Sequence, residues 1–154
     1  MAVGLRLGLD LCSPHECRCG TVVDARALHS FVSKKAPGKV IRHHSLNDLI
    51  ARSFSAAGVP VVKEPGLSCS DGKRPDGLSL VPWQNDKAIC WDVTVIYMLA
   101  DSYISVAARD ARAAAEHAAS RKEVKYVGLD GRYMFAPIAF ENLGVSYFQT
   151  FAEE

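Results

Sequence analysis

The chain has 154 residues, of which 49% are hydrophobic and 23% are charged, values that suit one globular unit with its own core. The net charge of +1 excludes strong overall attraction to nucleic acid, so any basic binding site would have to be local. No apolar stretch is long enough to span a membrane, and the first residues lack the pattern of a signal peptide, so we expect a nuclear or cytoplasmic protein that is not secreted.

Residues 1–40 should form a small head rich in cysteine and histidine. Of the five cysteines, three crowd with a histidine in CSPHECRC at 12–19. Without a secretion signal, such crowding favours a metal over disulfides. The alternative is a cluster of reduced thiols. Residues 34–39 read as a loop or linker to a second domain, residues 41–154.

The next elements are a helix and three strands. The helix should begin at Ser45, which can cap it with Asp48 three residues on, and end at Gly58. Strands should follow over 59–64, 76–83 and 88–97, the last two joined as a hairpin by QNDK at 84–87. The apolar face of the helix should carry Leu46, Leu49, Ile50 and Ala57, with Phe54 at its edge.

An alanine-rich helix is predicted over 102–127, and a last strand over 133–140. Pro137 suggests that this strand lies at an edge or carries a bulge, and the tail should be a short helix. The order after the head is α, β, β, β, α, β, α, which predicts an α/β fold with a mixed sheet flanked by helices. The helix should pack through the stripe Ala107, Ala111, Ala115 and Ala118.

Three acids lie in or beside the predicted strands: Glu64, Asp76 and Asp92. If these strands are neighbours, the carboxylates can converge on Mg²⁺ or Mn²⁺, which would offset their repulsion. The alternative is a solvated strand end for Glu64 and a turn for Asp76. Asp92 is harder to dismiss, because an unpaired carboxylate in an apolar strand is costly.

Two lysines near the end of the alanine-rich helix should face the same acids. Helical geometry places Lys122 in line with the alanine stripe and Lys125 one step to the side. An ammonium there would position a water or stabilise charge on a phosphate. The alternative is that both side chains snorkel past the helix end.

Seven short motifs sharpen this interpretation, because together they resemble a known family. In chain order they are CRCG (17–20), ALH (27–29), RHHSLNDLI (42–50), KEPGL (63–67), GKRPDGL (72–78), WDVTV (91–95) and RKEVKY (121–126). This order is similar to the restriction-like endonuclease domain of non-LTR retrotransposon polyproteins, over most of the chain. The resemblance implies the PD-(D/E)XK fold with its αβββαβ core and a Mg²⁺-dependent DNA endonuclease, a hydrolase that nicks DNA.

The resemblance also implies catalytic roles. Asp76 matches the aspartate of the Pro-Asp motif and Asp92 the second acid, both as Mg²⁺ ligands. Thr94 stands where the usual motif has its lysine. Lys122 best matches the displaced lysine of this family, and Lys125 is the second choice.

DNA contacts are implied for Arg42 and His43, which match an Arg-His pair before the first helix. Lys73 and Arg74, just before Pro75, are further candidates. A solvated basic loop is the equal alternative for Arg42 and His43. The implied partners are DNA and a reverse transcriptase region of the same element.

The family has a zinc knuckle of the form Cys-x-Cys, His, Cys, whose last position here is Ser33. The resemblance therefore implies a zinc site of Cys17, Cys19 and His29, with Cys12 or His15 as the fourth ligand, or a degenerate knuckle. Two other readings stay open. One is a catalytically inactive nuclease-fold module that binds DNA or a protein partner. The other is a small zinc-stabilised domain with surface acids.

Overall fold

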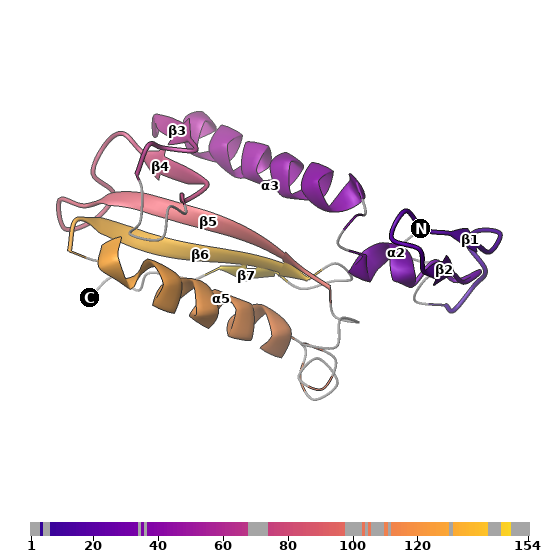
Figure 1. Cartoon of the computed structure of the whole chain (residues 1–154). Helices are drawn as coiled ribbons and strands as arrows, with labels where there is room; N and C mark the ends of the chain where they lie inside the picture. The colour runs from indigo at the N-terminus through magenta and orange to yellow at the C-terminus, as the bar shows by residue number, and fades with distance from the viewer. Residues whose placement is uncertain are drawn as a thin grey trace.

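The computed structural model describes residues 4, 7–33, 35, 37–67, 74–97, 103, 105, 110, 112–129, 131–141 and 146–148. Within them, five strands form one mixed sheet in the order β3-β4-β5-β6-β7. Helices α3 (Pro37–Ala56) and α5 (Ala113–Tyr126) lie on opposite faces of this sheet (Figure 1). The predicted α/β class is therefore confirmed. The strands are β3 (Val61–Lys63), β4 (Gly77–Ser79), β5 (Ala88–Ile96), β6 (Tyr133–Glu141) and β7 (Ser146–Phe148).

Strand β5 is the centre of the molecule and shows why both faces need a helix. Its side chains alternate across the sheet, as the pleat requires. Trp91 and Val93 belong to the core cluster under α3, whereas Cys90 and Ile96 belong to the clusters under α5. The strand is apolar on both faces because both are covered. Asp92 lies on the α5 face of this strand.

The start of the first helix was predicted wrongly. Helix α3 begins at Pro37, within the expected linker and before the expected domain boundary at residue 40. Proline is favoured in a first helical turn because its missing N–H needs no partner there. The early turns carry exposed Val40 and Ile41, so they lack the apolar pattern that the prediction used.

The apolar face of α3 was predicted only in part. Ile50 is buried, and Leu46 and Phe54 pack against the same cluster. Leu49, however, is 52% exposed, and Ala57 follows the helix as an exposed turn residue. The helix ends at Ala56, two residues before the predicted stop at Gly58, where a φ of +78° suits glycine.

Strands β4 and β5 form the predicted antiparallel hairpin. Its turn uses Asn85 and Asp86, both with positive φ (50° and 57°), as tight two-residue hairpin turns require. Strand β4 is shorter than predicted: residues 81–83 are exposed and lie outside it, although the Trp83 N–H still donates to the Lys87 carbonyl at 2.8 Å. Strand β3 pairs with β4 on its other side.

The second half of the chain adds α5 and two strands. Ala115 and Ala118 of α5 are buried against the sheet as predicted, whereas Ala107 and Ala111 lie outside the described residues. Strand β6 runs parallel to β5 and antiparallel to β7, so the prediction of an edge at Pro137 is wrong. Within the described pairs, β7 pairs with β6 from Ile138 onward. Pro137 therefore directly precedes the first β6 residue of that pairing. The predicted tail helix is also wrong for 146–148, which form β7.

The head contains a two-stranded antiparallel ribbon and one helical turn. The ribbon joins β1 (His15–Glu16) to β2 (Val22–Val23), and α2 (His29–Val32) follows. Within the described part of the chain, no helix combines the length and apolar character that crossing a bilayer requires.

Candidate functional site

Asp92 carries a charge inside the layer between the sheet and α5. Its residue is only 4% exposed, so the carboxylate needs polar partners. The Lys122 ammonium forms an ion pair with Oδ2, and the Tyr126 hydroxyl lies 2.7 Å from Oδ1. Lys125 Nζ lies 4.0 Å from the same Oδ1. Both lysines thus point towards the sheet, as predicted.

Tyr126 links this carboxylate to its surroundings. The ring is 1% exposed and packs on Phe135, with centroids 4.7 Å apart. Its hydroxyl accepts from Lys125 Nζ at 2.6 Å and also lies 3.0 Å from the carbonyl oxygen of Arg74. A hydroxyl has one hydrogen, so it is given either to Asp92 or to Arg74. The sequence motif RKEVKY contained this residue, but nothing in the local pattern assigned it a role.

Asp76 lies directly before the first residue of β4, next to β5. Its N–H donates to the Trp91 carbonyl at 2.9 Å, which extends the ladder by one residue beyond the Gly77–Trp91 pair. Asp76 Oδ2 then accepts the Val93 N–H at 2.6 Å. The carboxylate therefore replaces the backbone partner that a longer β4 would have supplied. Among the described residues, none donates to its Oδ1.

His43 reaches the same carboxylate from α3. Its Nε2 lies 3.1 Å from Asp76 Oδ2 and 3.2 Å from the Val93 carbonyl oxygen. Because a carbonyl only accepts, Nε2 must carry a hydrogen. The hydrogen bond to Asp76 raises the pKa of His43 above its usual 6.5, and the charges of Asp76 and Asp92 add to the rise. His43 was predicted to contact phosphate; the structure places it on Asp76.

A buried amide and a glycine hold the start of β4 in place. Asn47 is 4% exposed; it donates to the Asp76 carbonyl at 3.1 Å and accepts from Trp91 Nε1 at 2.9 Å. A Cβ built on Gly77 would lie 1.9 Å from a Trp91 ring carbon, so only glycine fits against that indole. Sequence reasoning missed Asn47, since an asparagine within a helix gives no signal of what it will face.

The other predicted site residues lie further from the two aspartates or cannot be placed. Glu64 touches the site only through its backbone N–H, which donates to the Asp76 carbonyl at 3.0 Å. Its side chain is exposed, and within the described residues the three acids do not form a common metal-ligand group. A Mg²⁺ site that includes Glu64 together with Asp76 and Asp92 therefore stays a prediction.

The predicted DNA-contact residues have separate surroundings. Arg42 donates to the Tyr97 hydroxyl at 3.1 Å, with its guanidinium 5.4 Å from that ring. Arg74 is exposed beside Asp76. Lys73 lies outside the described residues.

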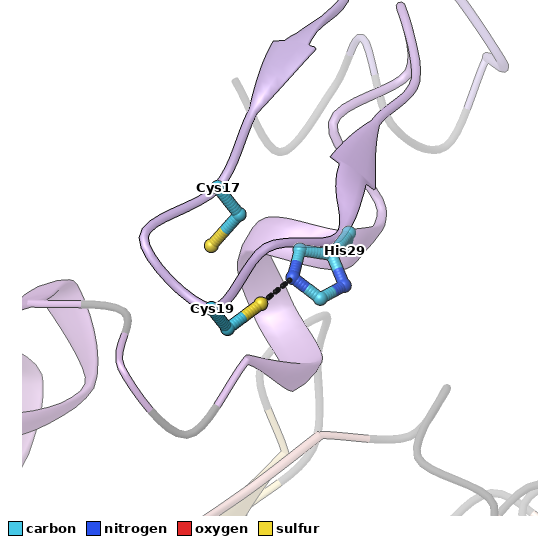
Figure 2. A group of neighbouring side chains, drawn as sticks. All are labelled: Cys17, Cys19 and His29. Carbon is cyan, nitrogen blue, oxygen red and sulfur yellow. Dashed lines mark hydrogen bonds between the residues drawn. The ribbon is translucent and has the colours of Figure 1, made fainter.

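The head brings three predicted metal ligands together. Cys17 directly follows β1, Cys19 lies in the turn after it, and His29 opens α2; their side chains converge in Figure 2. One ligand atom from each lies within 4.8 Å of the others, and Cys19 Sγ is 3.0 Å from His29 Nε2. Hydrogen bonds from Thr21, its hydroxyl first, lower the pKa of Cys19 from 9.0 to about 6, with smaller effects of Cys17 and His29. Thiolates and imidazoles of this kind could hold a metal such as zinc.

Cys12, predicted as the fourth ligand, is not part of this group. Its thiol faces the carbonyl oxygens of Asp24 and Ala25, at 3.4 and 3.8 Å. His15 Nδ1 lies 2.9 Å from the Ser13 carbonyl oxygen. Ser33 is beside the group instead, with its Oγ 3.5 Å from Cys17 Sγ.

No protein-family model matches this sequence, and no curated protein matches it either. Two sites are therefore defined by their own residues. Beside the β4–β5 pairing, Asp76 contacts His43 and Asp92 contacts Lys122, and the head brings two thiols to an imidazole.

Proposed function

We propose that the chain is a Mg²⁺-dependent DNA endonuclease domain of the PD-(D/E)XK class, from a retrotransposon-like element. One observation carries the proposal. Asp76 directly precedes Gly77, whose cross-strand partner Trp91 directly precedes Asp92, and Lys122 reaches Asp92 from the helix that covers the sheet. The order of α3, β3, β4, β5, α5 and β6 within the described residues and the ordered motifs that resemble this family support the same conclusion.

The acids fit a hard cation by their chemistry. Mg²⁺ prefers oxygen ligands and uses one or two carboxylates with water and phosphate oxygens. Asp76 has an oxygen with no described hydrogen-bond donor, and its side chain is 17% exposed. Asp76 and Asp92 would hold the ion, which when bound would lower the pKa of a coordinated water and screen the phosphate.

The protein's own groups would do the rest. Lys122 would leave its ion pair with Asp92 to stabilise negative charge developing on the phosphate. Lys125 is held on the Tyr126 hydroxyl nearby and is the alternative for this role. Arg74, exposed beside Asp76, would contact the DNA backbone, whose phosphates dominate affinity in such complexes.

Plasmid nicking tests the proposal. Asp76→Asn and Asp92→Asn keep the side-chain size but remove the charge, so both should lose Mg²⁺-dependent relaxation of supercoiled plasmid. Asp48→Asn is a matched control: Asp48 is exposed on α3 and paired with Lys63, so its removal should leave nicking unchanged. Wild-type nicking rates in either site variant would refute the assignment.

A second candidate is an inactive nuclease fold that binds DNA. The observation that favours it is that both oxygens of Asp92 already have partners, Lys122 and Tyr126. Under this alternative, the wild-type chain shifts plasmid in a gel but does not relax it with Mg²⁺ or Mn²⁺. Under either proposal, cleavage or binding of DNA, the chain would work in the nucleus or the cytoplasm.

For the head we propose a zinc ion held by Cys17, Cys19 and His29. Two thiolates and an imidazole are a common zinc donor set, and their convergence supports this metal. Metal analysis of the chain purified without chelator should find about one equivalent of zinc. Substitution of His29 by alanine should lower that content.

A further inference from the structure

The Cys17–Cys19–His29 group supplies three ligands, whereas structural zinc takes four. The two predicted candidates for the fourth position are both engaged with the backbone. Cys12 faces the carbonyl oxygens of Asp24 and Ala25, and His15 faces that of Ser13. Neither belongs to the group of ligand atoms within 4.8 Å of one another.

Ser33 lies next to the group instead. Its residue is 5% exposed, and its Oγ is 3.5 Å from Cys17 Sγ. The backbone N–H of Lys35 donates to this Oγ at 3.3 Å. The hydroxyl is therefore buried and oriented by its own loop towards a metal ligand. A neutral hydroxyl is a far weaker zinc donor than a thiolate, which is the form in which cysteine binds metal.

We infer that the head is a three-ligand metal site whose fourth position, beside Ser33, takes an exchangeable ligand: water or a small thiol. The inference rests on the proposed zinc site and goes beyond it. In metalloproteins, closed four-ligand sites are structural, whereas sites with three protein ligands keep an open position for an outside molecule. This head would accept a low-molecular-weight thiol and lose its metal to chelators faster than a closed site.

Cobalt substitution in the full chain tests the inference, with a phosphine as the reductant. Ser33→Cys should supply the fourth protein ligand. It should bind Co²⁺ about tenfold or more tightly than the wild type, which is the size of effect seen when an outer-shell partner of a metal ligand is changed. It should also gain sulfur-to-cobalt charge-transfer absorption. Added 2-mercaptoethanol should raise the same absorption in the wild type but not in Ser33→Cys.

Ser53→Cys is the matched control, because it adds a thiol on an exposed turn of α3 and should change neither quantity. If both proteins bind cobalt but Ser33→Cys behaves like the wild type, the inference is wrong and the three-ligand zinc proposal stands. An unchanged wild-type spectrum with 2-mercaptoethanol would also overturn it. If neither protein binds cobalt, the zinc proposal itself fails.

Discussion

Each of the two site aspartates has its own basic partner. The imidazole of His43 hydrogen-bonds Asp76, and the Lys122 ammonium forms an ion pair with Asp92. The two partners come from different helices on different faces of the sheet. Two carboxylates on adjacent strands would otherwise repel each other. The predicted repulsion between the carboxylates of Asp76 and Asp92 is therefore offset in this structure by protein groups. A divalent ion would have to compete with those groups.

This pairing predicts a pH dependence at His43. In chain kept free of divalent ions, its pKa should exceed 6.5, because Asp76 stabilises the imidazolium. A pKa raised on folding adds stability below the unfolded value, and that contribution is lost as pH rises through the folded pKa. Asp76→Asn should therefore lower the His43 pKa, as measured by NMR titration of the imidazole C–H signals.

Two further variants complete that titration. His43→Gln assigns the signal, and Asp48→Asn, which removes a carboxylate on the exposed side of α3, should leave the His43 pKa in place. A wild-type His43 that titrates at or below 6.5 would contradict the hydrogen bond to Asp76.

Among the elements, the three-residue strand β4 is the one that begins directly after Asp76. Gly77 lies against the Trp91 indole, which is fully buried. Gly77→Ala should force the indole or the strand to move, at a cost of about 1–3 kcal/mol in unfolding free energy. Urea unfolding would measure the change. Gly128→Ala is the control, because its added Cβ meets no atom within 4 Å; equal effects of the two substitutions would contradict the tight fit.

The elements that the sequence predicted well are those whose side-chain pattern reflects burial. Strand β5 was predicted over 88–97 and spans Ala88–Ile96, because a strand covered on both faces is apolar throughout. The first turns of α3 could not be found this way, since they extend beyond the core and carry exposed side chains. Strand β7 is three residues long and lies in a tail whose sequence has no clear alternation.

The positions of the site residues were predictable where they follow from strand pairing or helical period alone. Asp76 directly precedes Gly77, whose hairpin partner Trp91 directly precedes Asp92, and the helical period turns Lys122 towards Asp92. The partners of those groups were not predictable, because they depend on contacts between distant segments: His43 lies 33 residues from Asp76 in the chain, and Tyr126 lies 34 from Asp92. For the same reason Cys12 could be proposed as a metal ligand, although the fold turns its thiol towards the backbone.

At the scale of the whole molecule, the Asp92 carboxylate can be paired with Lys122 or with a divalent ion, and the two should compete for it. Lys122→Met keeps most of the side-chain volume but removes the charge. Without divalent ions it should lower the unfolding free energy by about 1–3 kcal/mol, less than for a fully buried pair, because the Lys122 side chain is 25% exposed. At this chain length that corresponds to a fall in Tm of about 2–4 °C per kcal/mol.

Added Mg²⁺ should then raise the Tm of Lys122→Met more than that of the wild type, because binding to the folded state stabilises it and no ammonium has to be displaced. Lys63→Met tests whether any lost lysine has this effect: it removes an exposed ion pair with Asp48, which contributes little, so its Mg²⁺ response should equal that of the wild type. Combining Lys122→Met with Asp92→Asn should abolish the extra response. If Lys122→Met gains no more from Mg²⁺ than the wild type does, then Asp76 and Asp92 do not bind the ion, and the lysine is a structural partner of Asp92.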